Sequence, residues 1–216
     1  MTQPKYVPAL GHDALTRFYD PLIAVTLREK TLKGRLLDQA AIGRGHRVLD
    51  VGCGTGTLAI LAKQRHPDAQ VVGLDGDPKV LAIARAKIAR AGVDVELHEG
   101  LAGPGAPFPP ASFDRVVTSF VLHHLTTDDK RAAFAAIRGW LRPGGELHVL
   151  DFGPQANPVL ALVARGLALL GGGDRVDDNW NGRLPALMRE VGFGHVEETG
   201  RAFTPFGSAS FYAARD

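Results

Sequence analysis

Five short runs rich in β-branched residues alternate with helical segments along the middle of the chain. The runs are RVLDV (47–51), AQVVGLD (69–75), VDVELH (93–98), FDRVVTSF (113–120) and GELHVLDF (145–152). Strands separated by helices are joined by crossovers, which place the strands parallel in one sheet. Two later runs, GHVEETGRAF (194–203) and SASFYAA (208–214), are close enough in sequence to pair antiparallel. The pattern predicts an α/β fold with a seven-stranded, mostly parallel sheet and helices on both faces.

The helices between these runs have recognisable ends and apolar faces. Asp77 is a suitable N-cap, Pro78 suits the first turn, and Gly92 closes the same helix. Its predicted buried face consists of Val80, Ile83, Ala84 and Ile88. The helix before the fifth strand presents Phe134, Ile137 and Leu141 on one face. That helix is predicted to end at the Pro-Gly-Gly turn of 143–145, and another helix is expected near 184–191.

A helical arm is expected before the first strand. Asp20 is a plausible N-cap for it, and Pro21 fits the first helical position. Its buried stripe is predicted to be Leu22, Ile23, Leu32, Leu36 and Leu37. The length of 216 residues suits one domain with a single core.

Charge and cysteine content exclude several classes of function. The 25 basic and 23 acidic residues nearly balance, so no overall field attracts nucleic acid. The single cysteine, Cys53, permits no internal disulfide and no thiolate zinc cluster, and we expect no metal site. Pro4 and Pro8 stand where a signal peptide would carry its apolar run, so we expect a cytoplasmic protein.

A glycine-rich turn follows the first predicted strand. Glycines at 52, 54 and 56 would let a ligand approach bare backbone at the carboxyl end of the sheet. Because position 57 is Thr57, the G-x-G-x-x-G spacing of dehydrogenases is not met, and no Gly-Lys-Ser/Thr of a P-loop follows. The alternative is a tight turn that only packs a helix on the sheet.

A carboxylate at the end of the second strand sharpens this prediction. Asp75 lies 23 residues after Gly52, where it can accept hydrogen bonds from both hydroxyls of a ribose. Asp75 could instead cap the next helix, but Asp77 is better placed for that cap. The pair of features therefore predicts a ligand that contains a nucleoside.

These motifs resemble those of the class I S-adenosylmethionine-dependent methyltransferases, over residues 45–153. VLDVGCGTG is similar to the first family motif, and GLDGD is similar to the second. PFPPASFDRVVTSFVLHHL and LRPGGELHVLDFG are similar to the fourth- and fifth-strand motifs. The nearest branch is the ubiquinone/menaquinone-biosynthesis-like (methyltransferase type 11) group. The resemblance implies a Rossmann-like sheet of order 3-2-1-4-5-7-6 with the last strand antiparallel.

The resemblance also implies S-adenosyl-L-methionine as cofactor and a layout along the chain. Residues 1–42 would form a helical arm or lid, 43–153 the cofactor-binding core, and 154–216 the substrate-side helices and C-terminal hairpin. The implied cofactor-binding residues are Asp50, Gly52, Cys53, Gly54, Gly56, Asp75, Gly76, Leu101, Ala102 and Ser119. One departure lies after the third strand, where the family usually has Gly-Asp-Ala and this chain has Gly-Leu-Ala. Either Leu101 packs against the adenine or another side chain recognises it.

Methyl transfer needs few catalytic groups, because a sulfonium methyl is already activated and positioning supplies most of the rate. The candidates near the reacting centre are Tyr19 of the arm, His124 after the fourth strand and Asp151 at the end of the fifth. His123 ranks below His124. The alternatives are a loop histidine bonded to backbone for His124 and a plain core aromatic for Tyr19.

The apolar segment 158–170 bears on the methyl acceptor. It carries only Arg165 as a charge and is too short to span a bilayer. Either the arm covers it, or it forms a wall of an acceptor pocket or contacts lipid peripherally, which favours a small apolar or amphiphilic acceptor. Two other classes stay open: a catalytically inactive S-adenosylmethionine-binding module and a nicotinamide-dependent oxidoreductase. A monomer and a homodimer are both compatible with the sequence.

Overall fold

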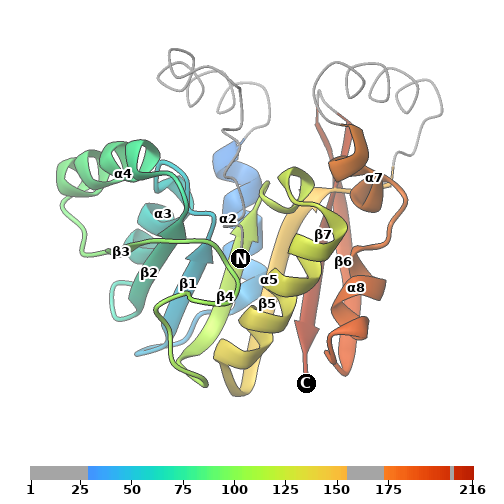
Figure 1. The fold of residues 1–216 in the computed structure, drawn as a ribbon. Coiled ribbons are helices and arrows are strands. Elements are labelled where there is room, and N and C mark those ends of the chain that lie inside the picture. The colour runs from blue at the N-terminus through green and yellow to red at the C-terminus, as the bar shows by residue number, and fades with distance from the viewer. Residues whose placement is uncertain (1–28, 155–172, 205–206) are drawn as a thin grey trace.

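The computed structural model describes residues 29–154, 173–204 and 207–216 (Figure 1). Seven strands form one sheet in the order β3-β2-β1-β4-β5-β7-β6. The strands are β1 Arg47–Val51, β2 Gln70–Asp75, β3 Glu96–Glu99, β4 Phe113–Ser119, β5 Leu141–Phe152, β6 His195–Thr204 and β7 Gly207–Arg215. β1 to β5 are parallel, and β7 pairs antiparallel with both β5 and β6. This confirms the predicted order and the predicted antiparallel last strand.

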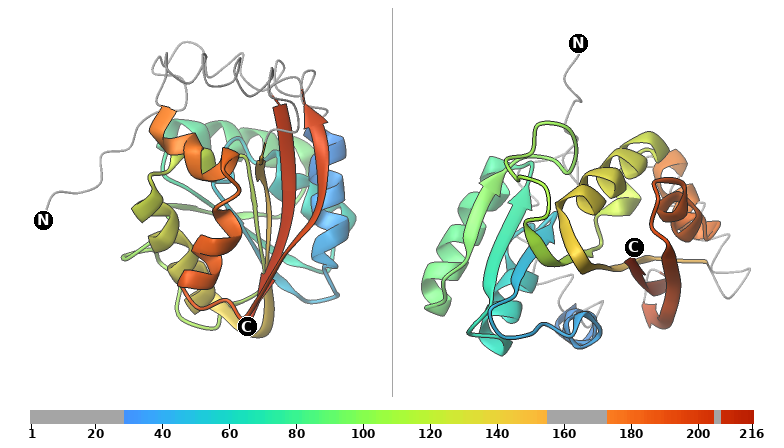
Figure 2. Two further views of the ribbon diagram at one scale, coloured as in Figure 1. Left: turned by 90° about the vertical axis from the view of Figure 1, so that its right-hand side faces the viewer. Right: turned by 90° about the horizontal axis from the view of Figure 1, so that it is seen from below.

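Helices cover both faces of the sheet, as the two views in Figure 2 show. They are α2 Glu29–Ala40, α3 Thr57–Arg65, α4 Pro78–Ala91, the 3-10 helix η1 Leu122–His124, α5 Thr127–Trp140, α7 Gly173–Trp180 and α8 Leu184–Glu190. One core cluster joins α2 and α3 to the sheet, and the other joins α5 and α8 to it. The strands between these layers are buried on both sides, which accounts for their β-branched, nearly continuous apolar runs.

The ends of α4 follow the sequence signals. The Asp77 side chain accepts from the backbone N–H of Lys79 at 2.8 Å, and Gly92 ends the helix in the left-handed conformation at φ +65°. The buried face differs slightly from the prediction, because Leu81, Ala84 and Ile88 are its buried residues. Val80 and Ile83 lie at the margin of that face, half-buried.

The predicted end of α5 is wrong by several residues. The helix ends at Trp140, and Leu141 is already the first residue of β5, paired with Phe113 of β4. The residue before a proline disfavours helical backbone, so Pro143 restricts the chain before the Gly-Gly pair is reached. β3 is also shorter than predicted and begins at Glu96.

The described part of the arm, α2, packs into the core. Leu36, Leu37 and Ala40 of α2 are fully buried, and Leu32 is nearly so. The predicted arm positions Tyr19, Asp20, Pro21, Leu22 and Ile23, and the apolar segment 158–170, lie outside the described residues. Among the helices of the described ranges, none is long and apolar enough to cross a membrane.

Candidate functional site

The glycine turn leaves β1 through three left-handed residues. Gly52, Gly54 and Gly56 have φ values of +66°, +56° and +80°. The backbone N–H groups of Gly52 and Cys53 both donate to the carbonyl of Leu74, at 2.8 and 3.0 Å, which fastens the turn to β2. Because L residues with a side chain disfavour this backbone region, the turn depends on glycine at alternate positions.

Gly52 also permits a close approach between the turn and the segment after β4. A Cβ added at Gly52 would overlap Val121 Cγ2 and lie 2.8 Å from Val121 Cγ1. The same addition at Gly54 meets nothing nearer than 4.0 Å. The turn and the start of η1 therefore touch at the point where the strand order reverses between β1 and β4, which is where open α/β sheets bind ligands.

Asp75 joins the end of β2 to the glycine turn. Its Oδ2 accepts from the backbone N–H of Gly54 at 2.8 Å, and its Oδ1 accepts from that of Asp77 at 3.0 Å. Burial raises the pKa of this carboxyl, and the two backbone donors partly offset the effect. Since each carboxylate oxygen can accept more than one hydrogen bond, Asp75 can still accept from two hydroxyls of a ribose.

Asp50 is a buried carboxylate with no hydrogen-bond partner in the described part of the chain. Only 1% of its surface is exposed, and burial raises its pKa to about 7, although Lys33 acts in the opposite direction. Lys33 itself forms a buried ion pair with Glu29 on α2. A buried carboxylate without partners is costly, and a cationic ligand group would lower that cost.

The remaining predicted cofactor residues lie along the same edge of the sheet. Burial raises the pKa of the Cys53 thiol far above its usual range, so the thiol stays protonated and is a poor nucleophile. Gly76 directly follows Asp75, and Ser119 is the half-buried last residue of β4. The structure thus brings Asp50, Gly52, Cys53, Gly54, Gly56, Asp75, Gly76 and Ser119 to the carboxyl ends of β1, β2 and β4.

Leu101 and Ala102 follow β3 at this edge. The preceding Gly100 donates its backbone N–H to the carbonyl of Asp75 at 2.9 Å, which holds the start of this loop beside β2. Ala102 packs against the core, whereas Leu101 is 45% exposed. Leu101 therefore offers an exposed apolar surface near Asp75, at the position where the family usually has an acid.

Asp151, at the end of β5, is fully buried and fully hydrogen-bonded. Its Oδ2 accepts from the backbone N–H groups of Val121 at 3.0 Å and Leu122 at 2.7 Å. Its Oδ1 accepts from His123 Nδ1 and from the backbone N–H of Phe152, both at 2.8 Å. Burial alone would raise the pKa of Asp151, but the His123 interaction and these donors hold it below its ordinary value. The carboxylate anchors η1 to the sheet.

His124 lies in a different environment from His123. Burial, reinforced by the charge of His123, lowers the pKa of His124 to about 3, so its imidazole is neutral at physiological pH. The two imidazole rings lie 4.0 Å apart between centroids. Arg175 of α7 reaches this segment and donates to the backbone carbonyl of His124 at 3.4 Å. This environment makes His124 a weak proton acceptor.

Aromatic rings line the same end of β4 and β5. Phe120 adopts the left-handed conformation at φ +55° although it is not glycine, a strain of about 1–2 kcal/mol that commonly marks functional sites. Its ring lies 5.4 Å from that of Phe152, and His123 packs 4.7 Å from Phe152. These rings form an apolar surface beside the two histidines.

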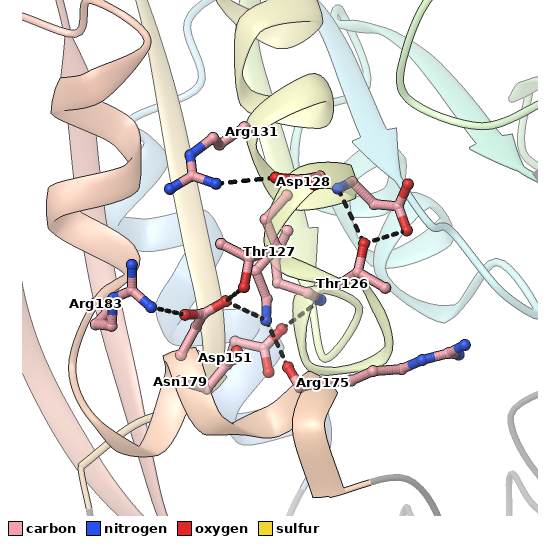
Figure 3. A network of polar contacts seen from close by, with 12 residues as sticks. Thr126, Thr127, Asp128, Arg131, Asp151, Arg175, Asn179 and Arg183 are labelled. Carbon is pink, nitrogen blue, oxygen red and sulfur yellow. Dashed lines mark hydrogen bonds and ion pairs between the residues drawn. The ribbon is translucent and has the colours of Figure 1, made fainter.

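A buried polar network that sequence reasoning missed holds α7 against α5 (Figure 3). Lys130 Nζ is 3.2 Å from Asp178 Oδ2, and it donates to the backbone carbonyl of Arg175 at 2.5 Å. Thr127 and Arg183 also donate to Asp178, at 2.6 and 2.9 Å. The network fixes the helix that covers η1. One signal was available, because Lys130 shares a helical face with Phe134 and Ile137.

Together these features define a class of protein: an open α/β domain with a nucleoside-binding edge formed by a glycine turn and the acid of the next strand. Comparisons with known proteins agree with this class. The family model described as a methyltransferase domain matches residues 48–145. A demethylmenaquinone methyltransferase from Thermus thermophilus is 39% identical over 131 residues, which are 61% of this chain and 58% of that protein.

An uncharacterized methyltransferase from Synechocystis is 32% identical over 160 residues, 73% of this chain and 71% of that protein. Among solved structures, phosphoethanolamine N-methyltransferase 2 from Haemonchus contortus, in complex with S-adenosylhomocysteine, superposes with a TM-score of 0.74 at 17% identity. That match covers 96% of this chain and 58% of the other. The chain belongs to the class I S-adenosylmethionine-dependent methyltransferases. It spans about half the length of the demethylmenaquinone methyltransferases it matches.

Proposed function

We propose that this chain transfers a methyl group from S-adenosylmethionine to a small acceptor. The observation that carries the proposal is the buried, unpartnered carboxylate of Asp50 behind a glycine turn that Asp75 holds in place. The methyl donor bears positive charge on its sulfonium and ammonium groups and has a ribose with two hydroxyls. The buried carboxyl group of Asp50 and the carboxylate of Asp75, which has free lone pairs, suit those groups.

The donor supplies an activated methyl group, and the residues of the chain hold the donor and the acceptor in place. Asp75 is assigned to the ribose, the turn of 52–56 to the methionine end, and Leu101 with Ala102 to the adenine. His124, Asp151 and Tyr19 stay predicted residues of the reacting centre; Tyr19 lies outside the described residues. Holding the acceptor in line with the methyl group and excluding water supply most of the rate.

The acceptor is proposed to be small and apolar or amphiphilic. The rings of Phe120 and Phe152 at the end of β4 and β5 support this choice, since aromatic surfaces suit apolar or planar ligands. The relatives named demethylmenaquinone methyltransferase and ubiquinone/menaquinone biosynthesis C-methyltransferase point in the same direction. An oxygen, a carbon or a nitrogen atom of such an acceptor could receive the methyl group.

Asp75→Ala is expected to weaken binding of S-adenosylhomocysteine by about 1.5–3 kcal/mol, roughly 10–150-fold, because a charge-assisted hydrogen bond is lost in a desolvated site. Isothermal titration calorimetry measures the change. Asp77→Ala is the matched control: it removes a helix cap two residues away and costs about 1 kcal/mol of stability without weakening binding. Equal affinities of wild type and Asp75→Ala would contradict the ribose assignment. Tight binding of a nicotinamide cofactor instead would favour an oxidoreductase.

Leu101→Ser is expected to weaken binding of S-adenosylhomocysteine by about 1 kcal/mol, or fivefold, because apolar area buried under the adenine is lost. The free energy of unfolding should stay nearly unchanged, since Leu101 is 45% exposed before binding. Phe203→Ser is the control. Phe203 is also a large exposed apolar residue, but it lies on β6 at the other edge of the sheet, so its replacement should leave the affinity unaltered. An affinity that does not change in Leu101→Ser would assign adenine recognition elsewhere.

A radiolabelled-methyl transfer assay identifies the acceptor class. Lipid extracts, quinol-like phenols, tRNA and bulk protein are offered in parallel. Label in phenols or lipids supports the proposal, and label only in tRNA or protein contradicts it. Binding of S-adenosylmethionine without transfer to any of these would favour a catalytically inactive binding module. Leu101 is the reason to test for that class, because it stands where the family usually has an acid.

A further inference from the structure

Three fully buried side chains of α7 and β7 carry an oxygen atom that has no hydrogen-bond partner in the described part of the chain. The atoms are Oδ1 of Asn179 on α7 and the hydroxyl oxygens of Ser210 and Tyr212 on β7. Asn179 and Ser210 are 0% exposed, and Tyr212 is 1% exposed. Buried polar atoms without a partner are rare and cost free energy, so these oxygen atoms point to a polar ligand group that pairs with them.

The three side chains gather at the carboxyl end of β5. Asn179 Nδ2 donates to the backbone carbonyl of Phe152 at 3.3 Å. The Ser210 hydroxyl lies against the next residue, because a Cβ added at Gly153 would come within 2.0 Å of its Oγ. Ser210 and Tyr212 are alternate residues of β7 and project from the same face of the sheet. Burial raises the pKa of Tyr212, and the nearby Ser210 hydroxyl acts in the opposite direction.

The donors and acceptors of this cluster match a hydroxyl group. The donation from Nδ2 to Phe152 orients the Asn179 amide, so its Oδ1 can only accept. The serine and tyrosine hydroxyls can each donate. A ligand hydroxyl that donates to Oδ1 and accepts from both protein hydroxyls pairs with all three oxygen atoms. A carbonyl would leave Oδ1 unpaired, and an ammonium group would leave both hydroxyl protons unpaired.

The cluster is remote from the turn that is assigned to the methyl donor. β7 is separated from β1 by β4 and β5. Three strand spacings amount to about 14 Å. A hydroxyl group bound here is therefore a different part of the acceptor from the atom that receives the methyl group. The cluster suits recognition of the acceptor, not proton transfer.

We propose that Asn179, Ser210 and Tyr212 bind a hydroxyl group of the methyl acceptor. The inference rests on the proposed function and deepens it, because it requires an acceptor with a hydroxyl group away from the methylated atom. The three side chains determine specificity, since an analogue without the hydroxyl leaves their oxygen atoms buried and unpaired. All three are covered by the fold, so the hydroxyl enters through a small separation of α7 from the end of β5.

A pair of ligands tests the site in the protein saturated with S-adenosylhomocysteine. 2-Naphthol and naphthalene differ by one hydroxyl group, and isothermal titration calorimetry measures both dissociation constants. We expect wild type to bind 2-naphthol about tenfold more tightly than naphthalene, and Ser210→Ala and Tyr212→Phe to bind the two about equally. Thr118→Val is the matched control, because it removes a fully buried, unpartnered hydroxyl of β4 and should keep the wild-type ratio.

Two results of this titration overturn the proposal. One is a wild-type protein that binds naphthalene as tightly as 2-naphthol, or binds neither. The other is a ratio in Ser210→Ala and Tyr212→Phe that equals the wild-type ratio. Either result leaves the proposed function standing, because binding of S-adenosylhomocysteine and transfer of label test that function separately. A wild-type protein that transfers label to no acceptor overturns both.

A second measurement needs no ligand. Loss of a hydrogen-bonded buried hydroxyl destabilises a protein, whereas loss of an unpartnered one does not. The urea midpoint of Tyr212→Phe should therefore equal or exceed that of wild type. A lower midpoint would show that the Tyr212 hydroxyl is bonded within the protein, and would overturn the proposal.

Discussion

Asp178→Asn is expected to lower the free energy of unfolding at pH 7 by about 3–4.5 kcal/mol, because it leaves a buried lysine without its counter-charge. Lys130 is 0% exposed and its ammonium lies 3.2 Å from Asp178. Burial already lowers the pKa of Lys130, and Asp178 opposes that effect. This loss has an upper limit of about 4.6 kcal/mol. An unpaired buried lysine can become neutral instead, and removing its proton at pH 7 from an ordinary pKa of about 10.4 costs about that much. Urea unfolding measures the change.

The loss should depend on pH in a defined direction. Burial alone would raise the pKa of Asp178, but the hydrogen bond from Thr127 and the charge of Lys130 hold it below its ordinary value. A depressed acid pKa stabilises the fold above the unfolded pKa of about 3.9, and this stabilisation is lost as the pH falls through the folded pKa. The difference between wild type and Asp178→Asn should therefore shrink below about pH 4.

Two further variants separate the charge effect from simple disruption. Asp128→Ala removes an exposed ion pair with Arg131 on the same helix and should leave stability unchanged within error. Lys130→Met combined with Asp178→Leu replaces the buried pair by apolar groups and should recover most of the loss. If the double variant is as unstable as Asp178→Asn, the network contributes through shape and not through charge.

The sheet could be predicted because the central strands are largely buried on both faces and so carry nearly continuous apolar runs. The observed bounds of β1 are those predicted, RVLDV. The bounds of the other strands differ from the predicted ones by only a few positions. Helix ends were predicted well where a cap specifies them, as at Asp77 and Gly92. The end of α5 has no such cap, and Leu141 continues the helical periodicity into a residue whose backbone pairs with β4.

The cofactor edge was predictable for a topological reason. Carboxyl ends of neighbouring parallel strands meet, so residues that directly follow β1 and β2 must lie together whatever the side-chain packing. The arrangement of the predicted catalytic residues depends on packing instead. His123 and His124 are adjacent in sequence. What distinguishes them is the contact of His123 with Asp151, a residue 28 positions away that the fold brings next to it. The pairing of Lys130 with Asp178 spans 48 residues and has no local pattern beyond a lysine on an apolar helix face.

Gly52→Ala is expected to lower the free energy of unfolding by about 2–5 kcal/mol and to abolish measurable binding of S-adenosylhomocysteine. Two costs add: about 1–2 kcal/mol for a left-handed alanine at φ +66°, and about 1–3 kcal/mol for overpacking against Val121, whose branched carbons cannot move away by a simple rotation. Thermal unfolding and calorimetry measure the two effects.

The matched controls divide this loss into its parts. Gly54→Ala has a similar backbone, φ +56°, but its new Cβ meets nothing within 4 Å apart from the Gly52 carbonyl at that limit, so it should incur only the conformational cost. Gly52→Ala combined with Val121→Ala should recover the overpacking part and keep the rest. If Gly54→Ala destabilises the protein as much as Gly52→Ala, the contact with Val121 contributes nothing. The glycine turn and η1 could then move apart to make room for the added methyl group without loss of stability.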